Sequence, residues 1–159
     1  IMSSDWSSDV CSSDLNYLKE GIDIYLKRLK HYISFSIMEI PAVKKSATHT
    51  PGVIKEKEAE LLTKHILKAD CIVLLDEKGK EMSSSEFSEF LQKKMNTGIR
   101  ELIFVVGGAW GFHESVKKTA HHKISLSRLT FSHQMVRLFF VEQLYRAFTI
   151  IKGEAYHNE

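Results

Sequence analysis

Residues 102–111 read LIFVVGGAWG, five apolar residues that run into a glycine-rich turn. A second apolar run, CIVLL, occupies residues 71–75. Short apolar runs without polar alternation are typical of strands buried on both faces, as in a parallel sheet. Ligands bind such sheets at the carboxyl ends of the strands. The two segments that follow these strands, residues 75–80 and 107–111, are therefore the first candidates for a site.

Three amphipathic helices are predicted before and between these strands, because apolar residues recur there at helical spacing. They are expected over residues 18–29, 53–68 and 87–95. Serines 83–85 offer N-caps to the third helix. Ile33, Phe35 and Ile37 alternate with serines and predict a strand that stops before Pro41. Alternation of strands and helices predicts an α/β fold, a small and mostly parallel sheet flanked by helices.

The last third of the chain predicts a short strand or ordered loop over residues 124–131, followed by a long helix over residues 133–151. Apolar residues occupy most of the circumference of this helix, so it must bury two faces. Either a partner subunit covers the second face, or the helix lies at the centre of the core. The same helix carries Arg137, Glu142 and Arg146. Charges in so apolar a helix are expected either to be functional or to form a structural pair, Arg137–Glu142 or Glu142–Arg146.

Length and composition place the chain among globular proteins of one domain. It has 159 residues, of which 43% are hydrophobic and 26% charged, and a formal net charge of +2. No apolar run reaches the roughly 18–20 residues of a membrane span. Two cysteines predict a reduced, cytoplasmic protein without a disulfide framework. So small a net charge does not by itself indicate a nucleic-acid-binding protein.

Residues 1–15 read IMSSDWSSDVCSSDL, with Ser-Ser-Asp three times, and nothing else in the chain is repetitive. The segment lacks the charged and apolar regions of a signal peptide. It is interpreted as a foreign or disordered tail, with a short interaction tail as the alternative. The domain organisation expected is therefore a tail over residues 1–15 and a single domain over residues 16–159.

Motifs of well-known catalytic sites are missing from the sequence. It contains no G-x-G-x-x-G, no phosphate-binding P-loop, no H-E-x-x-H and no G-x-S-x-G, so a metal site is not expected. The spacing of Gly107, Gly108 and Gly111 fits a plain turn as well as a ligand-binding loop. Asp76–Lys80 could supply an acidic ribose contact or form a solvated turn.

Five segments together carry a resemblance that none of them carries alone. They read LLDEKGK at 74–80, VVGGAWG at 105–111, LSRLTFSHQM at 126–135, EQLYRA at 142–147 and GEAYH at 153–157. In order and spacing they resemble the ribosomal large subunit methyltransferase H family, small bacterial members of the knotted SPOUT methyltransferases. The resemblance extends over residues 16–159.

This resemblance implies a C-terminal trefoil knot, a homodimer in which the last helix packs against its mate, and S-adenosylmethionine bound in the knot. The residues that it assigns to the cofactor are Leu75, Gly107, Gly108, Gly111, Leu126, Ser127, Arg128, Leu129, Thr130 and Phe131. The implied substrate is 23S rRNA in the assembled ribosome, and the implied reaction is methylation of N3 of a pseudouridine in the cytoplasm, without membrane or metal.

The candidates for catalysis are His133, Arg137, Tyr156 and His157. A histidine could take the N3 proton, Arg137 could hold a phosphate or the anionic base edge, and Tyr156 could stack on or hydrogen-bond the nucleobase. Two alternatives stay open, a non-catalytic RNA- or ribosome-binding module and a tRNA methyltransferase of the same fold.

The sequence departs from the family pattern at two places. Family members open with a strand and a glycine-containing turn, where this chain has the Ser-Ser-Asp repeats, so the first strand is expected to be missing. Ser132 stands where relatives often have proline, and serine can N-cap the helix that follows.

Overall fold

The structure is a computed structural model, and it describes residues 2–4, 16–41, 50–107 and 111–156. Its elements are β1 (Met2–Ser4), α1 (Asn16–Leu29), β2 (Glu39–Pro41), α2 (Pro51–Ile66), β3 (Cys71–Glu81), α3 (Ser84–Asn96), β4 (Leu102–Val106), α4 (Glu114–Thr119), β5 (His122–Ser125) and α5 (His133–Lys152). None of the helices in these ranges is long and apolar enough to cross a membrane.

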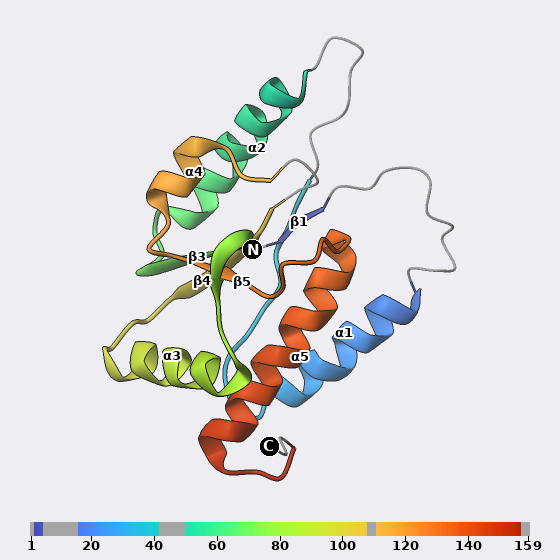
Figure 1. The fold of residues 1–159 in the computed structure, drawn as a ribbon, viewed down its shortest axis with the longest axis vertical. Helices are drawn as coiled ribbons and strands as arrows, with labels where there is room; N and C mark the ends of the chain where they lie inside the picture. The colour runs from blue at the N-terminus through green and yellow to red at the C-terminus, as the bar shows by residue number, and fades with distance from the viewer. Residues whose placement is uncertain (1, 5–15, 42–49, 108–110, 157–159) are drawn as a thin grey trace.

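The strands form one parallel sheet in the order β2-β1-β4-β3-β5. Helices α2 and α4 lie on one face of this sheet, and α1, α3 and α5 lie on the other (Figure 1). The predicted α/β architecture, a parallel sheet flanked by helices, is thereby confirmed.

Side chains of β3 and β4 alternate between two cores. Cys71, Val73 and Leu75 of β3 pack with α1, α3 and α5, whereas Ile72 and Leu74 pack with α2 and α4. Both faces of each strand are apolar because both are covered, which is why the sequence shows a continuous apolar run. Burial therefore holds the carboxyl ends of β3 and β4 at a fixed place in the fold.

Strand β3 is interrupted after Leu75. Both Leu75 and Lys80 pair in register with Ile124 of β5, so the residues between them leave the ladder as a bulge. Gly79 returns the chain to the sheet, and a Cβ built on it would lie 2.6 Å from the carbonyl carbon of Ile124. Only glycine allows β3 and β5 to approach so closely at this point.

Helix α5 is covered mainly by its own chain. Phe140, Val141, Leu144, Ala147 and Phe148 are buried against the sheet and the helices α1 and α3. In Figure 1, α1 runs beside α5, and α3 crosses near the later turns of α5. This arrangement matches the central-helix alternative for most of its apolar residues, and the expected homodimer is not tested by it.

Helix caps agree with the sequence. The Ser83 hydroxyl accepts from the Glu86 N–H at 3.1 Å while Glu86 accepts from the Ser83 N–H at 2.7 Å, a complete capping box for α3. The Ser132 hydroxyl accepts from the Met135 N–H at 3.4 Å, so serine does cap α5 in place of the family's proline.

The strand predicted from Ile33 up to Pro41 is confirmed only at its end. Phe35 and Ile37 do pack against the core, but the segment is irregular and strand β2 begins only at Glu39. Alternation of apolar and polar residues indicates that one face of an extended segment is buried. It does not show that a neighbouring strand is present to pair with that segment. The long helices and the strands at 71–75 and 102–106 are confirmed.

Part of the N-terminal tail forms a strand. Met2–Ser4, which the sequence places in the tail, pair in parallel with β2 and join β4 at Val106. A short first strand is therefore present where none was expected. Residues 5–15 lie outside the described residues, and the foreign origin of the segment stays a prediction.

Candidate active site

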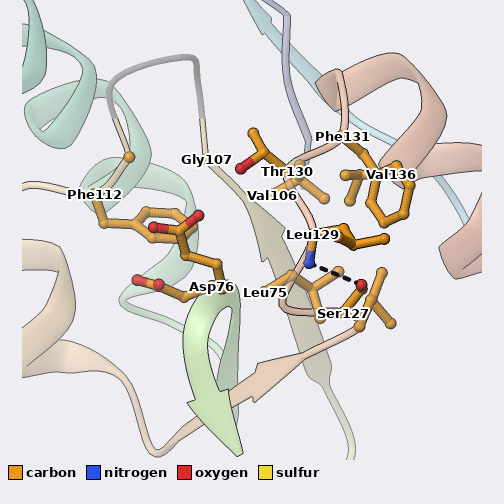
Figure 2. A pocket seen from close by; sticks show the side chains of 13 residues that line it. Leu75, Asp76, Val106, Gly107, Phe112, Ser127, Leu129, Thr130, Phe131 and Val136 are labelled. Carbon is orange, nitrogen blue, oxygen red and sulfur yellow. Dashed lines mark hydrogen bonds between the residues drawn. The ribbon is translucent and has the colours of Figure 1, made fainter. Parts of the chain in front are cut away.

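A cavity of about 330 Å³ opens at the carboxyl ends of β3 and β4 (Figure 2). Its volume lies in the range of small-molecule sites, about 300–1,000 Å³. Three stretches that lie far apart in the sequence meet around it, together with the start of α5. It is lined by Leu75, Asp76, Glu77, Val106, Gly107, Gly111, Phe112, Leu126, Ser127, Leu129, Thr130, Phe131 and Val136.

The register between β3 and β4 determines which residues form the floor of the cavity. Leu75 pairs with Val106 in the parallel ladder, so the regular parts of β3 and β4 end side by side. Gly107 continues from Val106, and a Cβ built on it would meet the Phe112 ring at 3.2 Å. Because Gly107 has no side chain, the cavity extends to the Phe112 ring. That ring is buried on the α2 and α4 side of the sheet and forms the bottom of the cavity.

Residues 126–131 cross the cavity as an ordered loop after β5. The Ser125 hydroxyl donates to the Ser127 carbonyl at 2.9 Å, and the Ser127 hydroxyl accepts from the Leu129 N–H at 3.0 Å. These two bonds bend the loop and turn Leu129 and Phe131 outward, with 71% and 37% of their surfaces exposed. Figure 2 shows Leu129, Phe131 and Val136 on one side of the cavity and Phe112 on the other.

Most of the residues assigned to the cofactor by resemblance do meet at this cavity. Leu75, Gly107, Gly111, Leu126, Ser127, Leu129, Thr130 and Phe131 line it. Arg128 belongs to the same loop but is exposed and does not line the cavity, and Gly108 lies outside the described residues. Val106, Phe112 and Val136 line the cavity without having been predicted, and Asp76 and Glu77 do so from the segment for which the sequence left a ribose contact and a solvated turn open.

Arg137 lies beside the cavity and is already paired. Its neighbour Val136 lines the cavity, and its own guanidinium donates to the Glu39 carboxylate at 2.8 Å. Arg137 is buried, whereas the Glu39 side chain is half exposed. The pair therefore ties the start of α5 to β2, and Arg137 does not pair with Glu142, the first of the two pairings considered for Glu142. His133 is the first residue of α5, and its side chain lies outside what the structure describes.

Tyr156 lies at the other end of α5, in a polar and aromatic cluster. Its phenol donates to Glu142 at 3.2 Å and contacts the Tyr25 hydroxyl at 3.3 Å, while its ring packs edge-on against Tyr145. Arg146 binds Glu142 at 2.5 Å and lies 4.8 Å from the centre of the Tyr156 ring. The predicted Glu142–Arg146 pair is thereby confirmed.

The same cluster raises the pKa of Tyr156. Burial, the hydrogen bond with Tyr25 and the charge of Glu142 all raise the pKa of Tyr156 above its ordinary value. A tyrosine is protonated at neutral pH even at its ordinary pKa of about 10, and this cluster makes ionisation of Tyr156 harder still. The phenol can donate a hydrogen bond or stack. His157 lies outside the described residues.

Within one chain the structure does not bring Tyr156 to the cavity. Helix α5 has 20 residues and separates Val136 from the tyrosine, a span of about 20–30 Å at 1.5 Å per residue. Of the four residues proposed for catalysis, only Arg137 and the backbone of His133 are described near the cavity. Among the described residues, no three histidine, cysteine or acidic side chains gather as a metal site.

A family model described as "Predicted SPOUT methyltransferase" matches residues 9–157 of the chain. The match spans every described element except β1 (Met2–Ser4). The chain is therefore a SPOUT methyltransferase by family.

Relatives narrow the assignment. A Christiangramia forsetii protein named "Ribosomal RNA large subunit methyltransferase H" is 55% identical over 146 residues, or 92% of this chain and 93% of the relative. A protein of the same name from Parabacteroides distasonis is 52% identical over 147 residues, or 92% of this chain and 94% of the relative. The chain belongs to the ribosomal RNA large subunit methyltransferase H family, which confirms the resemblance seen in its motifs.

Proposed function

We propose that this protein transfers a methyl group from S-adenosylmethionine to N3 of a pseudouridine in 23S rRNA, acting on the assembled ribosome in the cytoplasm. The observation that carries the proposal is the cavity at the ends of β3 and β4, where eight of the ten expected cofactor residues meet. Relatives that are 55% and 52% identical are named as methyltransferases of large-subunit rRNA, which supports the choice of substrate.

The residues present fit the cofactor. Gly107 keeps open a space that a Cβ would fill, directly above the Phe112 ring. Leu75, Val106 and Val136 add apolar surface of the kind that a flat adenine needs. When bound, S-adenosylmethionine supplies an electrophilic methyl group on a sulfonium. Alignment of that methyl with N3 accounts for most of the rate, so the rigid, buried strand ends are suited to the task.

The catalytic candidates take different roles in this proposal. Arg137, fixed by Glu39 at the start of α5, stabilises negative charge on the base edge or a nearby phosphate. His133 or His157 accepts the N3 proton, directly or through water. Tyr156, held protonated by its surroundings, hydrogen-bonds or stacks on the nucleobase.

The active form in this proposal is a homodimer. Tyr156 lies one helix length from the cavity of its own chain, so its role requires the C-terminal end of a second copy. Phe131 and Phe139 support this, because their rings meet edge-on 5.1 Å apart beside the cavity and stay 37% and 39% exposed. A dimer interface would bury them.

We also propose that the last third of the chain forms the family's trefoil knot, in keeping with the close passage of Gly79 over β5.

The test is the methylation state of rRNA. Mass spectrometry of 23S rRNA fragments should show one methylated pseudouridine that disappears in a deletion strain and returns with the gene. Purified protein should then methylate ribosomes from the deletion strain but not free tRNA. Activity on tRNA alone, or cofactor binding without any methylation, would replace the proposal with one of the two alternatives that the sequence left open.

A further inference from the structure

Two carboxylates line the cavity, and no cation lines it among the described residues. Asp76 and Glu77 follow Leu75 at the point where β3 leaves the ladder. Figure 2 shows Asp76 on the same side as Phe112, across the cavity from Leu129 and Phe131. One wall of the cavity is therefore apolar, and the opposite wall carries negative charge.

Two described cations near the cavity already bind other carboxylates. Lys117 of α4 lies close enough for Glu114 and, to a smaller extent, Asp76 to raise its pKa, and its ammonium is 2.7 Å from Glu114. Arg137 is bound to Glu39. Neither cation lines the cavity, so the charge of Asp76 and Glu77 still acts on whatever occupies it.

Asp76 is also held in place. Its Oδ1 accepts from the backbone N–H of Lys78 at 2.9 Å, a short turn that fixes the carboxylate at the rim. A carboxylate that is fixed before the ligand arrives loses little side-chain entropy when it binds. Asp76 therefore keeps one orientation at the rim of the cavity.

We propose that Asp76 and Glu77 make the cavity selective for the positively charged methyl donor over its neutral product. This inference rests on the proposed function. S-adenosylmethionine carries a sulfonium, an ammonium and a carboxylate, a net charge of about +1 at neutral pH. Methyl transfer breaks the carbon–sulfur bond and leaves its electron pair on sulfur, so S-adenosylhomocysteine has a thioether and no net charge. The product is then no longer attracted by the carboxylates of Asp76 and Glu77, which favours its release.

The experiment is calorimetric titration of the full chain with three ligands: the donor, S-adenosylhomocysteine and sinefungin. Sinefungin carries an amine in place of the methylated sulfonium, so it separates the effect of charge from that of the methyl group. The variants are Asp76→Asn, Glu77→Gln and the double substitution, each nearly isosteric with the original residue. Glu60→Gln on α2, an exposed carboxylate that does not line the cavity, is the matched control.

We expect the double variant to weaken the donor and sinefungin about tenfold and S-adenosylhomocysteine less than about twofold, as two partly screened charges near 5 Å would predict. The control should leave all three affinities unchanged. Equal weakening of the three ligands, or no weakening, would overturn the inference and leave the proposed function intact. A native protein that binds neither donor nor product would overturn both.

Discussion

Gly107 lies on the floor of the cavity, where a side chain would meet the Phe112 ring. A Cβ there lies 3.2–3.3 Å from three atoms of Phe112, so a bulkier residue must shift the ring and also fill space that the ligand would occupy. We expect Gly107→Val to weaken S-adenosylmethionine binding by at least about 100-fold, as loss of fit at a packed site commonly costs several kcal/mol. Calorimetry measures the affinity, and circular dichroism checks that the fold is kept. If a folded Gly107→Val variant bound S-adenosylmethionine as tightly as the native chain, the cofactor would not bind in this cavity.

Gly79 differs from Gly107 because the atoms that crowd it belong to the backbone of β5 and not to a side chain. A Cβ would lie 2.6 Å from the carbonyl carbon and 2.7 Å from the nitrogen of Ile124, and neither can move without separating β5 from β3. We expect Gly79→Ala to lower the free energy of unfolding by about 1–3 kcal/mol in urea titrations.

Gly52 provides the control for this substitution. It lies in the first turn of α2, and its Cβ would meet only the Thr50 hydroxyl at 3.9 Å. Gly52→Ala should leave the stability unchanged or slightly increased, because alanine favours the helix. Equal effects at the two glycines would show that β5 does not pass as closely over Gly79 as the structure has it.

At the scale of elements, Asp70 links the turn before β3 to the turn before β4. Its carboxylate accepts from the N–H groups of Arg100 at 2.9 Å and Glu101 at 3.1 Å, and these bonds lower its pKa below the ordinary value. Because the folded pKa is lowered, the stabilisation is present above the unfolded pKa, about 3.9, and is lost as pH falls through the folded pKa.

We therefore expect Asp70→Asn to be less stable than the native chain at pH 7 and to lose less of its remaining stability on acidification to about pH 3. Urea titrations at the two pH values measure both effects. Asp23→Asn, at an exposed carboxylate on α1, is the control and should follow the native curve. Parallel losses for Asp70→Asn and the native chain would show that the turn does not depend on the charge.

The elements that the sequence predicted well are those whose burial is two-sided or strongly periodic. Residues 71–75 and 102–106 are apolar throughout because helices cover both faces of the sheet, and few other structures produce that pattern. Helix α4 was not predicted, because six residues are too few to show a period. The bulge in β3 was likewise not predictable, since it depends on the register between β3 and β5.

At the scale of the whole molecule, the site was predicted only in part, and the reason is distance along the chain. Leu75, Gly107 and Phe131 were assigned through family motifs, and the sheet brings them together. Phe112 was missed because nothing in its local sequence shows that it lies under Gly107. For Asp76, the position directly after a buried strand was a usable signal, but the sequence favoured a solvated turn over a ligand contact.

The separation of Tyr156 from the cavity leads to a test of how two copies combine. In a homodimer that pairs the cavity of one chain with the C-terminal end of the other, Gly107→Val and Tyr156→Ala should each be inactive alone. Coexpressed, they form mixed dimers that hold one intact site, so about a quarter of the native activity should return. The measurement is transfer of labelled methyl groups to ribosomes from a deletion strain, with size-exclusion chromatography to verify dimers.

The control for this experiment replaces the Gly107→Val chain with the double variant Gly107→Val/Tyr156→Ala. This substitution removes the tyrosine that one chain would donate to the other and should abolish the recovery of activity. A mixture as inactive as its components would mean that Tyr156 acts within its own chain or serves only to hold the C-terminal cluster together.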